Sequence, residues 1–235
     1  MVPHILHNPV FNALSSGDAR FSNGTETVKY FDEAVSPFVG FVDQYENGFE
    51  ELYHLLPPSR KILFAKPNPI DIPNGWKLKA SIEGLQFVYE GKHQQADTFR
   101  KPVPLSHANV DEMIRLATLT KPGPFNRHTI DFGSYHGFFE DGKLIAMAGQ
   151  RLHVYNYTEI SAVCTHPDYL GRKYATALLQ HQLNVILNNG QIPFLHVRAD
   201  NERAIAVYEH LGFKVSRPMH FYFLEKEFQN GFQRP

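Results

Sequence analysis

The sequence predicts a mixed α/β fold, and three observations lead to that prediction. From Val103 onward, segments with helical periodicity alternate with short β-branched segments. Asp141-Gly142 separates two apolar segments, which favours a type I′ hairpin because both central residues of that turn need positive φ. A strand over residues 159–165 precedes a helix that begins near residue 174, and a further strand follows that helix.

Size and composition restrict the class of protein. The 235 residues suit one large domain or two small ones, and 43% hydrophobic residues suffice for a buried core. A formal net charge of −1 disfavours a nucleic-acid partner, which a broad basic field would hold. The single cysteine excludes an intramolecular disulfide and a multi-cysteine zinc site. The sequence has no charged leader and no run of about 18 apolar residues, so we expect a cytoplasmic protein without a membrane partner.

Residues 1–100 predict a smaller mixed α/β domain. The aromatic-rich residues 38–56 indicate a helix that ends at Pro57-Pro58, and residues 61–65 indicate a buried strand. Residues 78–89 surround Gly84 and predict a strand, a turn and a second strand. Residues 91–100 are polar, and we place there the boundary between this domain and a second one, residues 101–235.

The second domain shows clear helix and strand signals. Ser106 or Asn109 can cap its first helix, which should end before the breaker at residues 121–124. Three antiparallel strands then lead to Glu159. The next elements are a helix from residue 174 to Asn189-Gly190, a strand at 193–199, a helix at 201–211 and a strand at 219–226. Gly212 stands where a left-handed residue commonly ends a helix.

The turn between residues 165 and 176 has the character of an anion site. His166-Pro167-Asp168 ends the strand, and Gly171-Arg172-Lys173 leads into the helix. The first N–H groups of a helix lack internal partners, and the helix dipole places partial positive charge there. The backbone alone can therefore hold a pyrophosphate, and the two basic side chains add positive charge.

A second motif occupies residues 201–213, with the pattern Asn-x-x-Ala-x-x-x-Tyr-x-x-Leu-Gly-Phe. Asn201 and Tyr208 are two helical turns apart, so they share one helix face with Ala204 between them. Taken singly, Tyr208 can be a core residue and Asn201 a helix cap. The complete pattern is far more specific than any of its parts.

Together these segments resemble the acyl-CoA-binding core of the GNAT N-acetyltransferases, over roughly residues 103–226. Residues 159–167 and 193–197 are similar to the FR47-like branch, which includes relatives of the glycine N-acyltransferases. The resemblance implies a mostly antiparallel sheet in which two parallel strands, ending at Thr165 and Ala199, splay apart around acyl-CoA. For the first 100 residues it implies a degenerate half of the same fold that walls the acceptor groove.

The resemblance also assigns the cofactor contacts. It implies that the pantetheine arm is held by the backbone of the strand at 159–165 and by residues of the helix at 201–211. The residues concerned are Val163, Cys164, Thr165, Asn201 and Ala204. It implies that the turn and the first helical residues hold the pyrophosphate, at Gly171, Arg172, Lys173, Tyr174, Ala175 and Thr176. The usual loop, Gln/Arg-x-x-Gly-x-Gly/Ala, falls on Leu170, Lys173 and Ala175, and only Ala175 matches. A lysine at the glycine position is compatible with binding if its backbone is right-handed helical and its side chain points outward, and Gly171 can supply compensating flexibility.

Catalysis by this family needs a proton acceptor and a proton donor. The resemblance implies that Tyr208 protonates the departing CoA thiolate. Because an ammonium cannot attack a thioester, a base must take a proton from the amine. Glu159 is our first candidate, since some family members carry a glutamate there. His196, on the neighbouring strand, is the second, because an imidazole ordinarily titrates near neutral pH.

Two other chemistries are disfavoured. Strand alternation should point Cys164 away from the Glu159 face, and most such cysteines are small buried hydrophobes rather than nucleophiles. Among 13 histidines, only His4 and His7 are spaced three apart, so we expect no metal site.

We therefore expect a metal-free enzyme that moves an acetyl group from acetyl-CoA directly to a primary amine of a small molecule or peptide. A strand amide near Val163 would hold the oxyanion. The protein is expected to be a monomer or homodimer. The alternative is a non-catalytic CoA-binding module of the same fold, for sensing or assembly. The departures in the phosphate loop favour this alternative, and retention of both Glu159 and Tyr208 argues against it.

Overall fold

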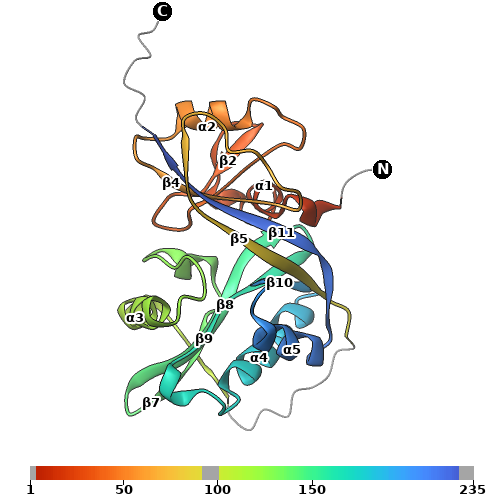
Figure 1. Ribbon diagram of the computed structural model, residues 1–235. Helices are drawn as coiled ribbons and strands as arrows, with labels where there is room; N and C mark the ends of the chain where they lie inside the picture. The colour runs from red at the N-terminus through yellow and green to blue at the C-terminus, as the bar shows by residue number, and fades with distance from the viewer. Residues whose placement is uncertain (1–3, 92–100, 228–235) are drawn as a thin grey trace, which may run out of the picture.

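The computed structural model describes residues 4–91 and 101–227, which form one mixed sheet flanked by helices (Figure 1). The strands are β1 Asn23–Gly24, β2 Val28–Tyr30, β3 Phe38–Phe41, β4 Lys61–Lys66, β5 Trp76–Tyr89, β6 Val103–Pro104, β7 His136–Glu140, β8 Lys143–Val154, β9 Tyr157–Thr165, β10 Ile192–Arg198 and β11 Phe213–Lys226. The α-helices are α1 Pro9–Leu14, α2 Gly48–Leu55, α3 Val110–Thr120, α4 Tyr174–Asn188 and α5 Glu202–His210. Short 3₁₀ helices lie at Ile5–His7, Ala19–Phe21, His107–Asn109, Thr129–Phe132 and Pro167–Tyr169.

The sheet is mostly antiparallel. Its strand order is β1-β2-β3-β4-β11-β5-β10-β9-β8-β7-β6. Among neighbouring strands, β3 with β4 and β9 with β10 run parallel, and the other pairs run antiparallel. The predicted fold class is therefore confirmed: the sheet is mixed, and the strand that carries residues 159–165, β9, runs parallel to β10.

Helices cover both faces of the C-terminal half. Helices α4 and α5 lie on one side of β8, β9 and β10, and α3 lies on the other (Figure 1). Leu179 and Leu183 of α4 pack with β-strand residues such as Phe87 in one core cluster. Met113 and Leu116 of α3 belong to a separate cluster on the opposite face. None of the helices in the described residues is long and apolar enough to cross a membrane.

The two halves repeat one order of elements. In the first half, β1, β2 and β3 pair antiparallel in sequence, and α2 crosses over to the parallel strand β4. In the second half, β7, β8 and β9 do the same, and α4 crosses over to β10. The sequence shows no matching repeat, so this similarity is visible only in the topology.

Two long strands are exchanged between the halves. β5, from the first half, pairs with β10, and β11, from the second half, pairs with β4. β5 and β11 also pair with each other from Phe213↔Tyr89 to Lys226↔Trp76. Each half therefore completes its sheet with a strand of the other. The division into residues 1–100 and 101–235 stays a prediction, and most of the expected linker, residues 92–100, lies outside the described residues.

Helix α1 packs closely against β3 of the first parallel pair. β3 and β4 pair only at Phe38↔Leu63 and Val39↔Phe64. Beyond this point the side-chain amide of Asn8 donates a hydrogen bond to the Phe41 carbonyl at 2.7 Å. A Cβ on Gly40 would lie 2.8 Å from the backbone nitrogen of Phe11, so only glycine allows α1 to approach so closely. Asn8 and α1 therefore occupy the end of β3 just beyond its pairing with β4.

Several expectations for the second domain are confirmed. Ser106 and Asn109 form a capping box just before α3. Asp141 and Gly142 have φ of 50° and 73°, as the hairpin requires. Gly212 has a φ of 99° after α5.

Three boundaries are wrong, each for a packing reason. Residues 38–56 are not one helix: β3 comes first, and the chain turns back so that Gly48 of α2 meets the Phe41 ring, which would lie 2.4 Å from a Cβ on Gly48. Gly84 marks no turn but lies within the continuous strand β5, where a Cβ would be 2.8 Å from Phe221 and 2.9 Å from the Val197 carbonyl. β11 begins at Phe213 instead of Met219, because the pairing with β5 continues through residues 213–218 across a bulge between Val215 and Arg217.

Candidate active site

The parallel strands β9 and β10 separate soon after they meet. They pair only from Ile192↔Tyr157 to Phe194↔Glu159. Beyond this point, within residues 4–91 and 101–227, β9 pairs with β8 alone and β10 with β5 alone. One edge of each strand is therefore open toward its carboxyl end, and the opening lies between the two strands that carry the sequence motifs.

A β-bulge in β9 sharpens this opening. The β8 register passes from Met147↔Cys164 to Gly149↔Ser161, which leaves one extra residue on β9. Ala162 takes up the irregularity with a φ of 53°. Bulges of this kind bend a strand and redirect its side chains.

The bulge overturns the predicted orientation of Cys164. Simple alternation placed Cys164 on the opposite face from Glu159. Instead Cys164 packs among α3 residues, whereas Ile160, the neighbour of Glu159, packs on the α4 side, so Glu159 faces the α3 side as well. Val163 packs on the α4 and α5 side. Burial raises the pKa of the Cys164 thiol to about 11, so a thiolate nucleophile is disfavoured at neutral pH.

The backbone of the turn before α4 is left-handed at Lys173, with φ 63° and ψ 15°. The condition of a right-handed helical backbone, under which a lysine suits the glycine position, is therefore not met. The left-handed conformation is the one that a glycine, the usual residue of the loop motif, adopts without cost. Gly171, with a φ of 79°, is left-handed as well. The backbone therefore keeps the shape that the motif glycine favours, although a lysine stands there.

The N-terminus of α4 has unused donors. Its N-cap, Lys173, provides no side-chain cap. The backbone amides of Gly171, Arg172, Lys173, Ala175 and Thr176 donate to no acceptor within the described residues. Donors of this kind, aligned with the helix dipole, suit an anion.

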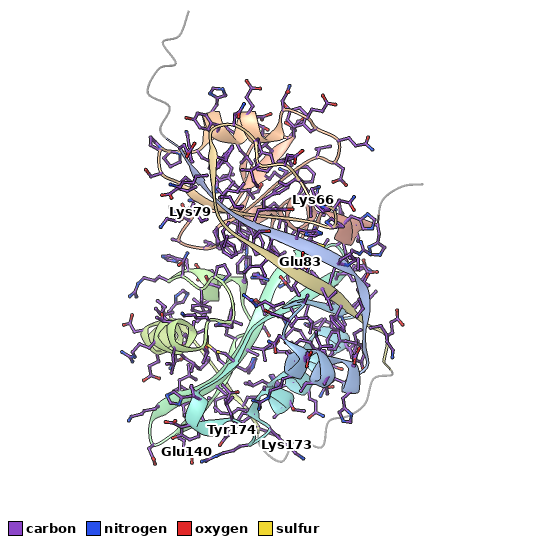
Figure 2. All side chains as sticks on the ribbon, viewed as in Figure 1. Lys66, Lys79, Glu83, Glu140, Lys173 and Tyr174 are labelled. Carbon is purple, nitrogen blue, oxygen red and sulfur yellow. The ribbon has the colours of Figure 1, made fainter. Side chains whose placement is uncertain are left out.

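Glu140, at the end of β7, ties this turn to the sheet. Its carboxylate accepts a hydrogen bond from the Tyr174 hydroxyl at 3.0 Å and lies 3.8 Å from the Arg172 guanidinium. Arg172 also lies over the Tyr169 ring, 4.9 Å from its centre. Figure 2 shows Glu140, Tyr174 and Lys173 together at one end of the molecule. Arg172 is half exposed, so its guanidinium can leave Glu140 for a phosphate.

The helix α5 presents the second motif. Asn201 caps it by accepting a hydrogen bond from the Ala204 amide at 3.2 Å. Tyr208 is buried, with Phe87 and Phe213 rings each 6.1 Å away. Burial raises the pKa of Tyr208 to about 12, so its hydroxyl stays protonated at neutral pH.

Glu159 and His196 are brought into direct contact. Glu159 is fully buried, and its Oε1 lies 2.7 Å from Nδ1 of His196. Arg151 donates to both carboxylate oxygens, from Nε at 2.8 Å and from Nη2 at 2.7 Å. Burial alone would raise the pKa of Glu159, but Arg151 and then His196 outweigh it and lower this pKa to about 2.

Gln86 completes a buried polar row across β5, β10, β9 and β8. Its Nε2 donates to the Leu6 carbonyl and lies close to Nε2 of His196, each contact being 3.0 Å long. If Gln86 donates to His196, the imidazole proton is on Nδ1 and points at Glu159. Sequence reasoning missed Arg151 and Gln86, because neither belongs to a motif and Gln86 comes from the first half.

A pocket opens beside this row. Its volume is about 110 Å³, and His196 and Arg151 line it. Its other walls come from β3, β4, β5 and β11 and from the loop at residues 122–124 after α3. The pocket thus lies on the α3 side of the sheet, across from α4 and α5. No group of three or more His, Cys, Asp or Glu side chains in the described part of the chain is arranged to hold a metal ion.

Comparisons with known proteins identify the fold and the family. The family model of FR47-like proteins matches residues 135–223. A crystal structure from Novosphingobium aromaticivorans, assigned to the GNAT acetyltransferases, is 32% identical, covers 96% of this chain and 100% of its own, and superposes with a TM-score of 0.89. A GCN5-related N-acetyltransferase from Kribbella flavida shares the fold at 12% identity, with a TM-score of 0.61 over 94% of this chain and 95% of its own. No curated protein sequence matches the chain.

Proposed function

Because this chain belongs to the GNAT family of acetyltransferases and to its FR47-like branch, we propose that it transfers an acetyl group from acetyl-CoA to a primary amine. One observation supports this above the others. β9 and β10 stop pairing at Glu159, so they part between the Glu159 and His196 pair and the uncapped N-terminus of α4, the helix that follows β9. A thioester that passes through the opening would meet an amine in the pocket.

The residues around the opening fit coenzyme A. The free amides of residues 171–173 and 175–176 would hold the pyrophosphate, with Arg172 adding charge. The open edge of β9 at Val163, Cys164 and Thr165 would pair with the amides of the pantetheine arm. Ala204, a small residue on α5, leaves room for that arm. Acetyl-CoA itself supplies the activated carbonyl.

The transfer needs two proton movements. The neutral amine attacks the thioester carbonyl, a C–N bond forms and the C–S bond breaks. The proton leaving the nitrogen goes to a base, and the sulfur receives one from Tyr208. The backbone amide near Val163 would stabilise the oxyanion.

We assign the base role to His196, with Glu159 as the residue that orients it. Both carboxylate oxygens of Glu159 are occupied, and a carboxylate with a pKa of about 2 is a weak base. His196, in contrast, lines the pocket. Glu159 accepts the Nδ1 proton and so leaves the Nε2 lone pair for the substrate, which would replace the hydrogen bond from Gln86.

A second candidate is a CoA-binding module without catalysis. The Glu140 carboxylate beside Arg172 favours it, because that carboxylate weakens the attraction for phosphate. The buried pair of Glu159 and His196 argues against it, since simple CoA binding needs no such pair.

Two measurements test the proposal together. Saturating acetyl-CoA should stabilise the folded protein by about 2.7 kcal/mol at a hundredfold excess over Kd. Addition of a panel of amines should then release free CoA thiol. Stabilisation without thiol release from any amine would favour the binding module, and a melting curve unchanged by millimolar acetyl-CoA would exclude both functions.

A further inference from the structure

The pocket beside His196 has walls that restrict the amine. We infer that the acceptor is an α-amino acid with an apolar side chain about the size of an aromatic ring. This inference rests on the proposed acetyl transfer, and it adds the chemical class of the acceptor.

The first wall is apolar and comes largely from the N-terminal half. Phe38 and Leu63 are 1% and 2% exposed, and Phe221 of the exchanged strand β11 is 9% exposed. Half-buried Ile82 and Phe223 extend the same wall. A flat apolar group that enters here would leave water for a surface made almost entirely of carbon.

The charges in the lining are positive. Arg151 and Arg198 line the pocket, and no Asp or Glu is among its described lining residues. Glu159 is fully buried behind Arg151 and so offers no carboxylate to a substrate. A second ammonium, as in a polyamine or a lysine side chain, would therefore find no carboxylate in the lining itself, whereas a carboxylate would find two guanidinium groups.

Both arginines retain donors for a carboxylate. Arg151 binds Glu159 through Nε and Nη2, and its Nη1 makes no hydrogen bond within the described residues. Arg198 holds Asp200 in the same way, but that pair is exposed, with 59% and 67% of the two side chains accessible. An exposed pair is worth little and exchanges partners readily.

His196 lies in the same lining as the arginines and the apolar wall. One carbon atom that carries an amine, a carboxylate and an apolar side chain can address all three at once. The positive charge of the arginines also favours the neutral form of the amine, which is the form that attacks the thioester.

Calorimetry on the full chain saturated with CoA tests the inference without need of turnover. L-Phenylalanine should bind about tenfold or more tighter than glycine, which lacks the side chain, and than phenethylamine, which lacks the carboxylate. If glycine binds as tightly as phenylalanine or more tightly, the apolar side chain is not recognised. If phenethylamine or spermidine binds as tightly as phenylalanine or more tightly, the carboxylate is not recognised. Absence of phenylalanine binding would overturn the whole inference.

Two variants assign the charge. Arg198→Gln should weaken the binding of phenylalanine by about fivefold or more, because the carboxylate loses a charged hydrogen-bond donor. The binding of phenethylamine, which has no carboxylate, should not change. Arg203→Gln removes an exposed arginine outside the pocket lining, and should change neither. An equal effect of Arg198→Gln on both ligands would contradict the carboxylate contact. Release of CoA thiol, measured with the same amines, distinguishes the two proposals. If phenylalanine binds but no thiol is released, the inferred amino-acid site stands and the proposed acetyl transfer is refuted.

Discussion

Replacing Glu159 by glutamine should destabilise the protein strongly, because Glu159 is the counterion of a buried arginine. The carboxylate is fully buried and receives two hydrogen bonds from Arg151 and one from His196. Lowering its pKa from 4.5 to about 2 corresponds to about 3 kcal/mol, at 1.36 kcal/mol for each pKa unit. Removing one partner of a buried ion pair costs about 3–5 kcal/mol of stability in other proteins, which agrees with the value derived from the pKa of Glu159.

Urea unfolding at pH 7 measures this loss. Glu159→Gln should lower the free energy of unfolding by about 3–4 kcal/mol. Glu209→Gln, at an exposed position on α5, should change it by less than about 0.5 kcal/mol. Replacing the pair together, by Arg151→Met with Glu159→Leu, should recover most of the loss, because no unpaired charge remains. A loss below about 1 kcal/mol in Glu159→Gln would refute the reasoning.

The ion pair of Glu159 and Arg151 should also make the free energy of unfolding fall at acidic pH. The pKa of Glu159 is lower in the folded protein than in the unfolded chain, so its contribution is complete above pH 4.5 and is lost as the pH falls toward about 2. Wild-type protein should lose about 3 kcal/mol over this interval through Glu159, and Glu159→Gln should lack that component. Parallel curves for the two proteins would contradict the assigned pKa direction.

Four further predictions concern single residues. Lys173→Gly should be more stable than Lys173→Ala by about 1 kcal/mol in urea unfolding, because only glycine relieves the left-handed backbone, and equal stability would contradict that strain. Tyr208→Phe should lower kcat about 100-fold with CoA affinity nearly unchanged, and equal activity would make Tyr208 a core residue only. His196→Gln should abolish the ascending limb of the kcat/KM profile against pH, and a retained limb would mean that the limb reports the amine itself. Burial, and secondarily His136, lower the pKa of His181 from 6.5 to about 4, so stability should fall as pH drops across this range and His181→Gln should lessen the fall.

The sequence predicted the C-terminal half well because its signals are local. The hairpin at Asp141-Gly142, the cap at Ser106 and the apolar face of α4 depend on neighbouring residues, and each lies where expected. The positions of Glu159 and His196 on adjacent strands followed from the family resemblance, and the structure brings their side chains together at 2.7 Å.

What the sequence did not predict depends on contacts far along the chain. Gly84 resembles a turn residue until Phe221 and Val197 are placed against it. The bulge at Ala162, which moves Cys164 to the Glu159 face, carries no glycine or proline as a signal. Gln86 reaches His196 only because β5 lies beside β10, and that pairing joins residues 110 apart in sequence.

The exchange of β5 and β11 has a consequence for how the chain must fold during its synthesis. β4 gains its outer partner only when β11, close to the end of the described chain, has been made. At a synthesis rate of about 5–20 residues per second, the edge of β4 stays unpaired for roughly 8–30 seconds, far longer than hairpin formation takes. The N-terminal half must therefore wait as an incomplete sheet on the ribosome, where unpaired strand edges invite chaperones or misassociation. Deleting residues 213–235 should leave both halves unable to close, so the activity of one half cannot be recovered by cutting away the other.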